Sequence, residues 1–172
     1  MSRPIFLIGP PGAGKTHWAK RWAELRDLRW VDTDQRVAED AGMSIADIWE
    51  TYGQIHFRSL EHAAVRSLTE GDADDTIVST GAGAPVWIDN MDMMLGVGCV
   101  VYLEADAPLL AKRLDGEGGA RPLLKIYGGE EGLEQLIAER APIYQKAHIT
   151  LAAVDCTDTT IDQILAACTS RP

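Results

Sequence analysis

The chain has 172 residues, of which 46% are hydrophobic and 24% charged. These fractions are typical of a soluble globular protein and exclude a disordered, fibrous or membrane-spanning chain, and the length predicts one domain over residues 1–172. The net charge of −10 disfavours binding to nucleic acid or to an anionic membrane, so any anionic ligand has to be met by a few placed basic groups.

The predicted elements alternate short apolar runs with longer helical stretches, which is typical of an α/β fold with a mostly parallel sheet covered by helices. Strands are expected at residues 5–8, from residue 30 into Asp32-Thr33-Asp34, and at 76–79, 97–103 and 148–151. Helices are expected at residues 15–25, 35–69 with breaks near Gly42 and Gly53, 107–114, 130–147 and 159–168. The glycine-rich segment 115–129 predicts either a functional lid or a disordered loop.

The cysteines and the amino terminus indicate a cytoplasmic protein. Cys99, Cys156 and Cys168 are odd in number, widely spaced and without a Cys-x-x-Cys pair, so we expect reduced thiols and neither a disulfide framework nor a zinc site. The first residues show no signal-peptide hydrophobic region, and no apolar run approaches the length of a membrane span.

Residues 9–16, with the sequence GPPGAGKT, fit the phosphate-binding pattern G-x-x-x-x-G-K-[ST] at every fixed position. They follow an apolar strand and begin a helix, so backbone N–H groups and the helix amino terminus can surround phosphate oxygens. Lys15 can reach the β- and γ-phosphates, and the Thr16 hydroxyl can bind Mg²⁺. The sequence therefore predicts binding of ATP or GTP with Mg²⁺, and the lack of a guanine-reading Asn-Lys-x-Asp segment favours a small-metabolite kinase over a GTPase.

Further segments carry side chains suited to an acceptor substrate. They are Asp32-Thr33-Asp34, the stretch 53–58 (GQIHFR) with Glu61 one helical turn beyond, Gly81-Ala82-Gly83, Arg121-Pro122-Leu123-Leu124 and Arg140-Ala141-Pro142-Ile143-Tyr144. Taken singly, each has a simpler interpretation: a solvated strand end that caps the next helix, an exposed ion pair on a helix, or an exposed arginine. Trp49 and Phe57 fit core packing as well as the apolar wall of a ligand pocket.

In this order and spacing, these segments and the phosphate-binding loop resemble the shikimate kinase family over essentially the whole chain. The resemblance implies a five-stranded parallel sheet of the nucleoside-monophosphate-kinase type, with a substrate-binding subdomain at about 35–62 and a lid at about 115–129. It also implies transfer of the γ-phosphoryl group of ATP to the 3-hydroxyl of shikimate. The expected partners are ATP, shikimate and Mg²⁺, and the expected state is a monomer.

The resemblance assigns a role to each matching position. Arg58 and Arg140 match the pair that binds the shikimate carboxylate, and Glu61 holds Arg58 in place. Asp34 matches the group that binds the acceptor hydroxyls and takes or orients the proton, while Asp32 matches the position that holds magnesium through water. The expected nucleotide-binding residues are Gly12, Ala13, Gly14, Lys15, Thr16, His17, Arg113 and Arg121, with a contribution from the loop near 155–158. The expected substrate-binding residues are Asp34, Arg58, Gly81, Ala82, Gly83 and Arg140. The expected catalytic residues are Lys15, Asp34 and Arg121. The expected metal ligands are Thr16 and Asp32.

Two positions depart from the family pattern. Ala82 stands where the family usually has glycine, which would cost about 1 kcal/mol or more if the backbone there is left-handed. Gln54 stands where glutamate is usual. These departures leave open a kinase acting on another polyhydroxylated acid such as gluconate, or a nucleotide-binding homologue with weakened catalysis.

Overall fold

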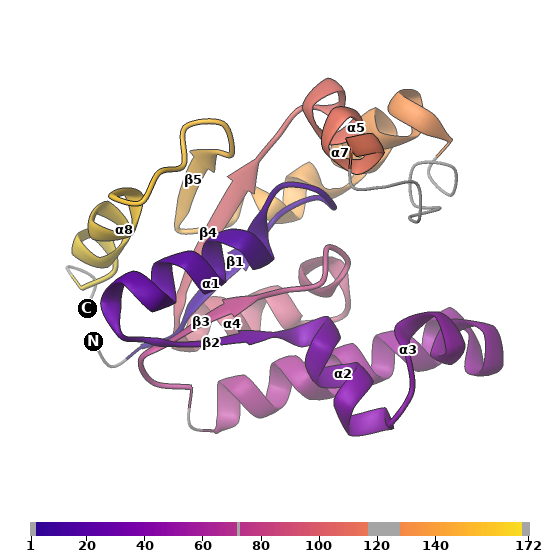
Figure 1. The fold of residues 1–172 in the computed structure, drawn as a ribbon. Coiled ribbons are helices and arrows are strands. Elements are labelled where there is room, and N and C mark those ends of the chain that lie inside the picture. The colour runs from indigo at the N-terminus through magenta and orange to yellow at the C-terminus, as the bar shows by residue number, and fades with distance from the viewer. Residues whose placement is uncertain (1–2, 72, 117–127, 170–172) are drawn as a thin grey trace.

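The computed structural model describes residues 3–71, 73–116 and 128–169, and within them it contains a five-stranded parallel sheet in the order β2-β3-β1-β4-β5 (Figure 1). The strands are β1 (Ile5–Ile8), β2 (Arg29–Asp32), β3 (Thr76–Ser79), β4 (Cys99–Glu104) and β5 (Ile149–Ala152). The helices are α1 (Lys15–Arg26), α2 (Thr33–Ala41), α3 (Ile45–Glu70), α4 (Asn90–Val97), α5 (Ala107–Gly116), α7 (Gly129–Tyr144) and α8 (Thr160–Thr169), with a 3₁₀ turn η1 at Ala84–Val86. The predicted α/β fold is confirmed.

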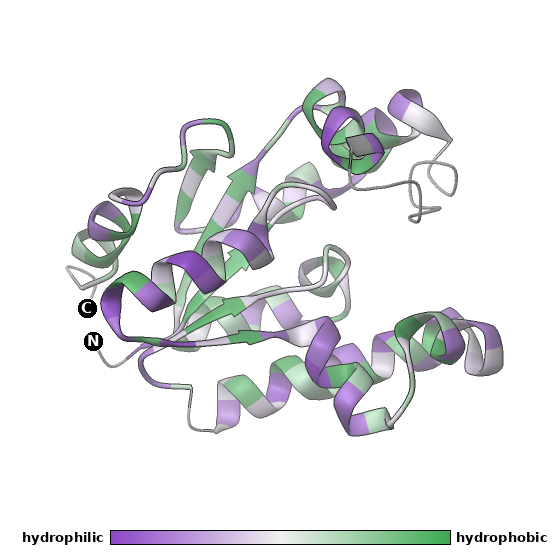
Figure 2. Cartoon of the chain, in the orientation of Figure 1, coloured by the Kyte–Doolittle hydropathy of each residue, from purple (hydrophilic) through white to green (hydrophobic). Residues whose placement is uncertain are grey.

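Strand β1 is fully buried because its alternating side chains enter two different cores. Ile5 and Leu7 pack into the cluster that includes residues of α1 and α8, whereas Phe6 and Ile8 pack into the cluster that includes residues of α3 and α4. A strand covered on both faces reads as a continuous apolar run, which is why the sequence alone locates it. Figure 2 shows the hydrophobic colour on the central strands, whereas the helices carry both colours. Among the described helices, none combines the length and apolarity needed to cross a membrane.

Helices α2 and α3 form a smaller layer beside β2 with its own cluster of buried residues: Val37, Ile48, Phe57 and Ala64. The two predicted helix breaks are confirmed. Gly42 ends α2 with φ 62°, and Gly53 interrupts α3 with φ 80° and ψ 173°. Both conformations are accessible to glycine and strained for residues with a Cβ.

The segment between β3 and β4 was not predicted. It holds η1 and α4, and α4 runs to Val97, so β4 begins two residues later than the expected start at Val97. Gly98 closes this helix by donating its N–H to the carbonyl of Met94. The other predicted strands and helices are present, with ends displaced by a few residues at most.

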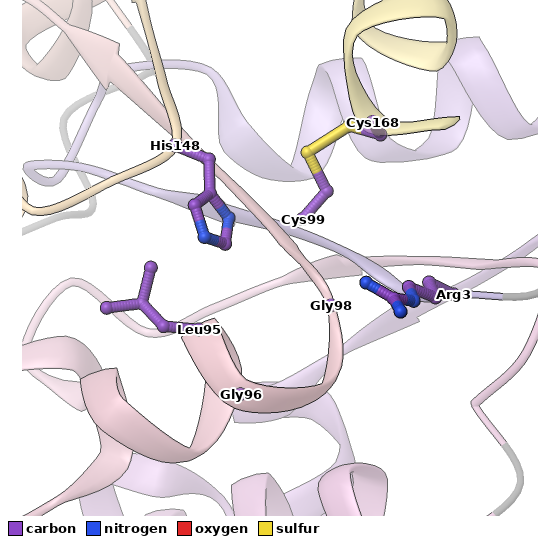
Figure 3. Close-up of a pocket in the computed structure, with 7 residues that line it drawn as sticks. All are labelled: Arg3, Leu95, Gly96, Gly98, Cys99, His148 and Cys168. Carbon is purple, nitrogen blue, oxygen red and sulfur yellow. A yellow bond between two sulfur atoms is a disulfide. The ribbon is translucent and has the colours of Figure 1, made fainter. Parts of the chain in front are cut away.

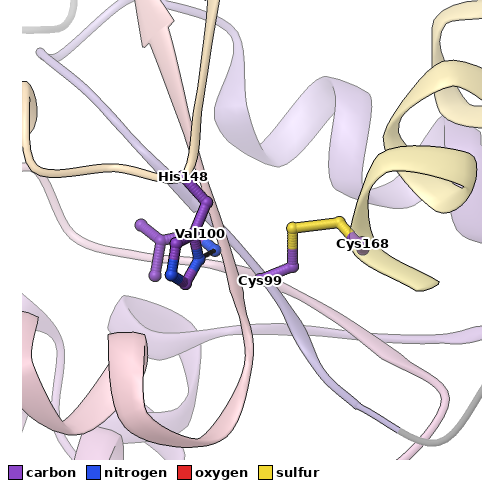
Figure 4. The surroundings of a disulfide bond; sticks show 4 residues. All are labelled: Cys99, Val100, His148 and Cys168. Carbon is purple, nitrogen blue, oxygen red and sulfur yellow. Dashed lines mark hydrogen bonds between the residues drawn. A yellow bond between two sulfur atoms is a disulfide. The ribbon is translucent and has the colours of Figure 1, made fainter. Parts of the chain in front are cut away.

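Cys99 and Cys168 form a disulfide, so the expectation of three reduced thiols is wrong for this pair (Figure 4). Cys99 begins β4, and Cys168 lies in the last turn of α8, 69 residues further along the chain. Cys156 is free and buried. A cavity of about 340 Å³ lies beside the disulfide, between Arg3 and His148 (Figure 3). Because Cys99 is at the amino end of β4, this cavity is at the edge of the sheet opposite to residues 9–16.

Candidate active site

The loop between β1 and α1 has the backbone shape that phosphate binding requires. Gly12 has φ 80° and Gly14 has φ 94°, and Gly14 is the N-cap residue of α1. Ala13 between them is fully buried. The left-handed conformations bring successive N–H groups to one side of the loop, where they add to the partial positive charge at the start of α1.

Lys15 lies inside this loop. Its ammonium donates hydrogen bonds to the carbonyl oxygens of Gly9 and Pro10, each at 2.9 Å. Burial lowers the pKa of Lys15 to about 8, and the carboxylates of Asp34 and Asp32 act in the opposite direction. The ammonium is therefore held inside the loop by two backbone carbonyls.

Thr16, Asp32 and Ser79 meet at the carboxyl ends of β2 and β3. The Thr16 hydroxyl donates to Asp32 Oδ2 at 2.7 Å and lies 3.1 Å from Ser79 Oγ. Asp32 and Ser79 are paired in register on the two strands. The other oxygen of Asp32, Oδ1, accepts from the N–H groups of Asp34 and Gln35 and caps α2. The simpler interpretation of this strand end, a helix cap, is therefore confirmed, and the same carboxylate also contacts Thr16 of the phosphate-binding loop.

A cavity of about 600 Å³ extends from the phosphate-binding loop to the start of the loop after β5. Arg113 connects the two sides of this cavity. Its Nη1 donates to the carbonyls of Gly12 and Ala13 at 3.2 and 3.1 Å, and its Nη2 donates to the carbonyl of Ala153 at 3.4 Å. The cavity is lined by Gly12, Gly14, Lys15, Thr16, His17, Trp18, Arg113, Ala153, Val154 and Cys156. Most of the nucleotide-binding residues expected from the sequence therefore lie around one space.

The loop Gly81-Ala82-Gly83 is the centre of a second cluster. A Cβ placed on Gly81 would overlap both Asp34 Oδ1 and Glu61 Oε1, and a Cβ placed on Gly83 would overlap the guanidinium of Arg58. These side chains therefore lie directly against the loop, and the two glycines are required for their close approach. On the same loop, Arg140 donates from Nη1 to the carbonyl of Ala82 at 2.9 Å.

Asp34 and Glu61 each present a buried oxygen, Oδ1 and Oε1, that has no hydrogen-bond partner among the described residues. Burial raises the pKa of Asp34, and the nearby charge of Asp32 adds to the rise. Burial also raises the pKa of Glu61 to about 7, against the opposing effect of Arg58. Buried acceptors are normally satisfied, so these two carboxylate oxygens mark a place where an additional hydrogen-bond donor can bind.

The Arg58–Glu61 pair is not a surface ion pair. Arg58 Nη1 lies 2.5 Å from Glu61 Oε2, and the two side chains are only 12% and 1% exposed. The Arg58 guanidinium also lies over the ring of Phe57, with 5.3 Å from Cζ to the ring centroid. Glu61 and the Phe57 ring together fix the direction of Arg58.

The two departures from the family pattern have little structural cost. Ala82 is not among the described residues with positive φ, so the strain expected for a left-handed alanine does not arise. Gln54 is exposed. Phe57 is buried in the cluster between α2 and α3, and Trp49, 39% exposed, lies with its ring centroid 5.6 Å from that of Phe57.

The remaining expected residues are Arg121, His17 and the loop near 155–158. Arg121 and most of the expected lid, residues 117–127, lie outside the described residues. His17 is exposed and meets the nucleotide cavity at its rim. In the loop near 155–158, Asp158 accepts a hydrogen bond from Arg21, and this bond lowers the pKa of the Asp158 carboxyl. Cys156 of the same loop lines the nucleotide cavity.

Sequence reasoning missed two contributors, Thr33 and Ser79. The buried Thr33 hydroxyl accepts the N–H of Gly81 at 2.8 Å and so fixes the loop to the start of α2. Ser79 joins the Thr16–Asp32 pair. Both occupy the position where a parallel strand ends at the carboxyl edge of the sheet, and that shared position is the signal that could have identified them.

The two clusters are electrostatically coupled, because Asp34, Arg140 and Glu61 all influence the pKa of Lys15. A cavity at the phosphate-binding loop and a charged cluster around residues 81–83, both at the carboxyl edge of a parallel sheet, are the arrangement of P-loop kinases, and the fold places the chain in that class. The sequence profile described as "Shikimate kinase" matches residues 11–169. The chain belongs to the shikimate kinase family.

Individual relatives agree with this assignment. A shikimate kinase of Parabacteroides distasonis is 39% identical over 153 residues, which are 87% of each chain. A solved shikimate kinase from Acinetobacter baumannii, in complex with shikimate, superposes with a TM-score of 0.84 at 32% identity, covering 96% of this chain and 94% of the other. A gluconokinase from Sinorhizobium meliloti 1021 shares the fold, with a TM-score of 0.59 at 15% identity over 96% of this chain and 91% of its own.

Proposed function

We propose that this protein transfers the γ-phosphoryl group of ATP to the 3-hydroxyl of shikimate. The observation that carries the proposal is the cluster around residues 81–83, where two guanidiniums and the unpaired buried oxygen of Asp34 lie against one loop. Shikimate is a small carboxylic acid with three hydroxyl groups, so its carboxylate can bind the guanidiniums and a hydroxyl can donate to the buried carboxylate oxygen. Membership of the shikimate kinase family supports the same substrate.

In this proposal, Arg58 and Arg140 bind the acceptor carboxylate. A planar guanidinium can donate two parallel hydrogen bonds to a carboxylate, whereas a lysine offers only a point charge. Both arginines already have one fixed partner, Glu61 for Arg58 and the Ala82 carbonyl for Arg140. Their remaining N–H groups are thereby directed before the substrate arrives, which lowers the entropic cost of binding.

Asp34 binds the hydroxyl that attacks phosphorus. Its Oδ1 lies against Gly81 and accepts no hydrogen bond within the described chain. Because phosphoryl transfer passes through a loose transition state, the main task of this carboxylate is to orient the hydroxyl, and it receives the proton as the new P–O bond forms. The raised pKa of Asp34 brings its proton affinity closer to that needed for this transfer.

The glycine-rich loop and Lys15 bind the β- and γ-phosphates, with the adenosine end of ATP directed toward Arg113. Phosphate oxygens replace the carbonyls of Gly9 and Pro10 as partners of the Lys15 ammonium. Their negative charge restores the pKa that burial has lowered, so the lysine remains a cation in the complex. Arg121, which corresponds to the family's lid arginine, completes the proposed nucleotide site and stabilises the charge that develops on the transferred group.

The residues near the phosphate-binding loop fit Mg²⁺. A threonine hydroxyl and a carboxylate 2.7 Å apart are hard oxygen donors, and Mg²⁺ is usually held by one or two such groups together with water and substrate phosphates. Thr16 would bind the ion directly and Asp32 through water. When bound, Mg²⁺ neutralises charge on the β- and γ-phosphates.

The proposal extends to the state and location of the protein: a monomer in the cytoplasm, with no nucleic-acid or membrane partner. The charge of −10 supports the lack of nucleic-acid and membrane partners, and the family resemblance supports the monomer and the cytoplasm, whereas the Cys99–Cys168 disulfide argues against a reducing compartment. In a reducing cytoplasm, glutathione and thioredoxin keep most thiols reduced. Thiol trapping after rapid quenching, which measures the fraction of Cys99 and Cys168 that is oxidised in cells, therefore tests the compartment. A mostly reduced pair supports the cytoplasm, and a mostly oxidised pair contradicts it.

A coupled ADP-release assay with shikimate, gluconate and no acceptor tests the function. We expect turnover with shikimate, little with gluconate and least without acceptor. Lys15→Ala should abolish turnover, while Lys20→Ala, an exposed lysine of the same helix, should leave it unchanged. Robust turnover of gluconate with none of shikimate would refute the assignment, and single-turnover measurements without any burst of phosphorylated product would reduce the protein to a nucleotide binder.

A further inference from the structure

Tyr144 reaches the acceptor pocket from a position that the proposed chemistry does not use. It is the last residue of α7 and is fully buried. Its ring packs against Tyr102, with 5.1 Å between ring centroids and 36° between the ring planes. Its hydroxyl donates a hydrogen bond to the carbonyl oxygen of Ala82 at 2.6 Å.

The same carbonyl oxygen accepts the hydrogen bond from Arg140. Arg140 precedes Tyr144 by four residues on α7, so the two side chains lie on one face of the helix, one turn apart. A backbone carbonyl has two lone pairs and can accept two hydrogen bonds, and at Ala82 it accepts one from the guanidinium and one from the phenol. The Ala82 carbonyl thus joins both side chains to the loop.

Fixing this one carbonyl fixes the geometry of the pocket. Gly81 and Gly83, on either side of Ala82, are the points at which Asp34 and Arg58 approach the loop. A rotation of the Ala82 peptide would move the anchor of Arg140 relative to both. The aromatic packing of Tyr144 limits where its hydroxyl can lie, so its hydrogen bond defines the direction of the carbonyl more firmly than a solvent-exposed donor could.

We propose that Tyr144 is a positioning residue for the acceptor: its hydroxyl orients the Ala82 carbonyl and thereby aims the Arg140 guanidinium at the acceptor carboxylate. This inference rests on the proposed function. Tyr144 touches neither substrate in this account, and its effect passes through Arg140. The expected signature is a change in acceptor binding without a change in ATP binding.

The substitution Tyr144→Phe removes only the hydroxyl and retains the ring that packs against Tyr102. We expect the KM for shikimate to rise about tenfold, the usual magnitude for the loss of one hydrogen bond, with kcat and the KM for ATP within about twofold of the wild type. The control is Tyr102→Phe, which deletes the hydroxyl of the neighbouring ring; that residue lines a separate cavity with Glu104 and should leave both KM values unchanged.

A double-mutant cycle separates positioning from a general loss of packing. In an Arg140→Ala background, Tyr144→Phe should change the dissociation constant of shikimate by less than about twofold, because the group that it aims is already absent. A full tenfold effect in that background, or an unchanged KM in the single variant, overturns the inference while leaving the proposed function intact. Equal losses for both substrates together with a lowered melting temperature also overturn it. Failure of the wild-type protein to turn over shikimate would instead refute the proposed function, and this inference with it.

Discussion

Replacing Arg58 by alanine separates the two substrates, because this guanidinium faces the acceptor loop and not the nucleotide cavity. A hydrogen bond to a charged group contributes roughly 1.5–3 kcal/mol, and a guanidinium offers two of them to a carboxylate. Losing both costs roughly 3–6 kcal/mol. At 1.4 kcal/mol for each factor of ten, kcat/KM for shikimate should fall by about two to four orders of magnitude.

The effect of this substitution on folding should be smaller than that of a typical broken buried ion pair. Removing one partner of such a pair usually costs about 3–5 kcal/mol, because the other charge remains buried and uncompensated. Burial already raises the pKa of Glu61 to about 7, so without Arg58 its carboxyl takes up a proton at neutral pH instead of staying charged. We therefore expect a free energy of unfolding lower by roughly 1–3 kcal/mol and a folded variant.

The assay varies each substrate separately by coupled ADP release, and calorimetry measures shikimate and ATP binding one at a time. Arg66→Ala is the matched control, since Arg66 lies two turns further along α3 and forms an exposed pair with Glu70. It should leave all kinetic constants unchanged. A loss of less than tenfold in kcat/KM for shikimate, or an equal loss of ATP affinity, would refute the reasoning.

Further substitutions address the loop, the buried carboxyl and the disulfide. Gly81→Ala should abolish shikimate binding, because the new methyl group overlaps two carboxylate oxygens, whereas Ala82→Gly should change kcat/KM by less than about threefold, since no left-handed strain is relieved. The kcat/KM for shikimate should rise with pH up to about 7 and then level off, because the ionised form of Glu61 holds Arg58 in place. In Glu61→Gln, the kcat/KM for shikimate should be lower than in the wild type and should not change over this pH range. Between the ordinary pKa of 4.5 and about 7, the folded state holds the Glu61 proton more tightly than the unfolded state, so the contribution of this group to stability falls as pH rises. Cys168→Ser should lower the free energy of unfolding by about 2–4 kcal/mol, with Cys156→Ser as the control for loss of a buried thiol outside the disulfide.

Each of these has a contrary outcome. Normal acceptor binding in the Gly81 variant would mean that the carboxylates do not lie against the loop. A pH profile that persists in Glu61→Gln would assign the titration to another group. Equal stability of the Cys168 variant and the wild type, both measured without reductant, would show that the disulfide does not stabilise the native state.

The sequence predicts best those features that depend on local pattern. The apolar run at residues 5–8 and the glycine-rich loop after it are recognisable because a doubly covered strand and a phosphate-binding turn each tolerate few residue types. The breaks at Gly42 and Gly53 are readable for the same reason, since only glycine adopts these backbone angles without strain.

Features that depend on tertiary contact were not accessible from pattern alone. The spacing of Cys99 and Cys168 in the sequence does not indicate that they pair. They pair because the fold brings α8 back to the amino end of β4 (Figure 4). Helix α4 is short and rich in methionine, and its glycine at position 96 weakens the helical pattern. The sharing of the Ala82 carbonyl by two side chains of α7 requires the loop and the helix to be placed in three dimensions.

The central claim is that one carboxylic acid lies between two guanidiniums with its hydroxyl on a buried carboxylate. A crystal structure of the protein with shikimate and MgADP tests it most directly. We predict density for shikimate against residues 81–83, with its carboxylate on Arg58 and Arg140 and its 3-hydroxyl on Asp34 Oδ1. Shikimate bound elsewhere, or bound there with its carboxylate turned away from both arginines, would contradict the account.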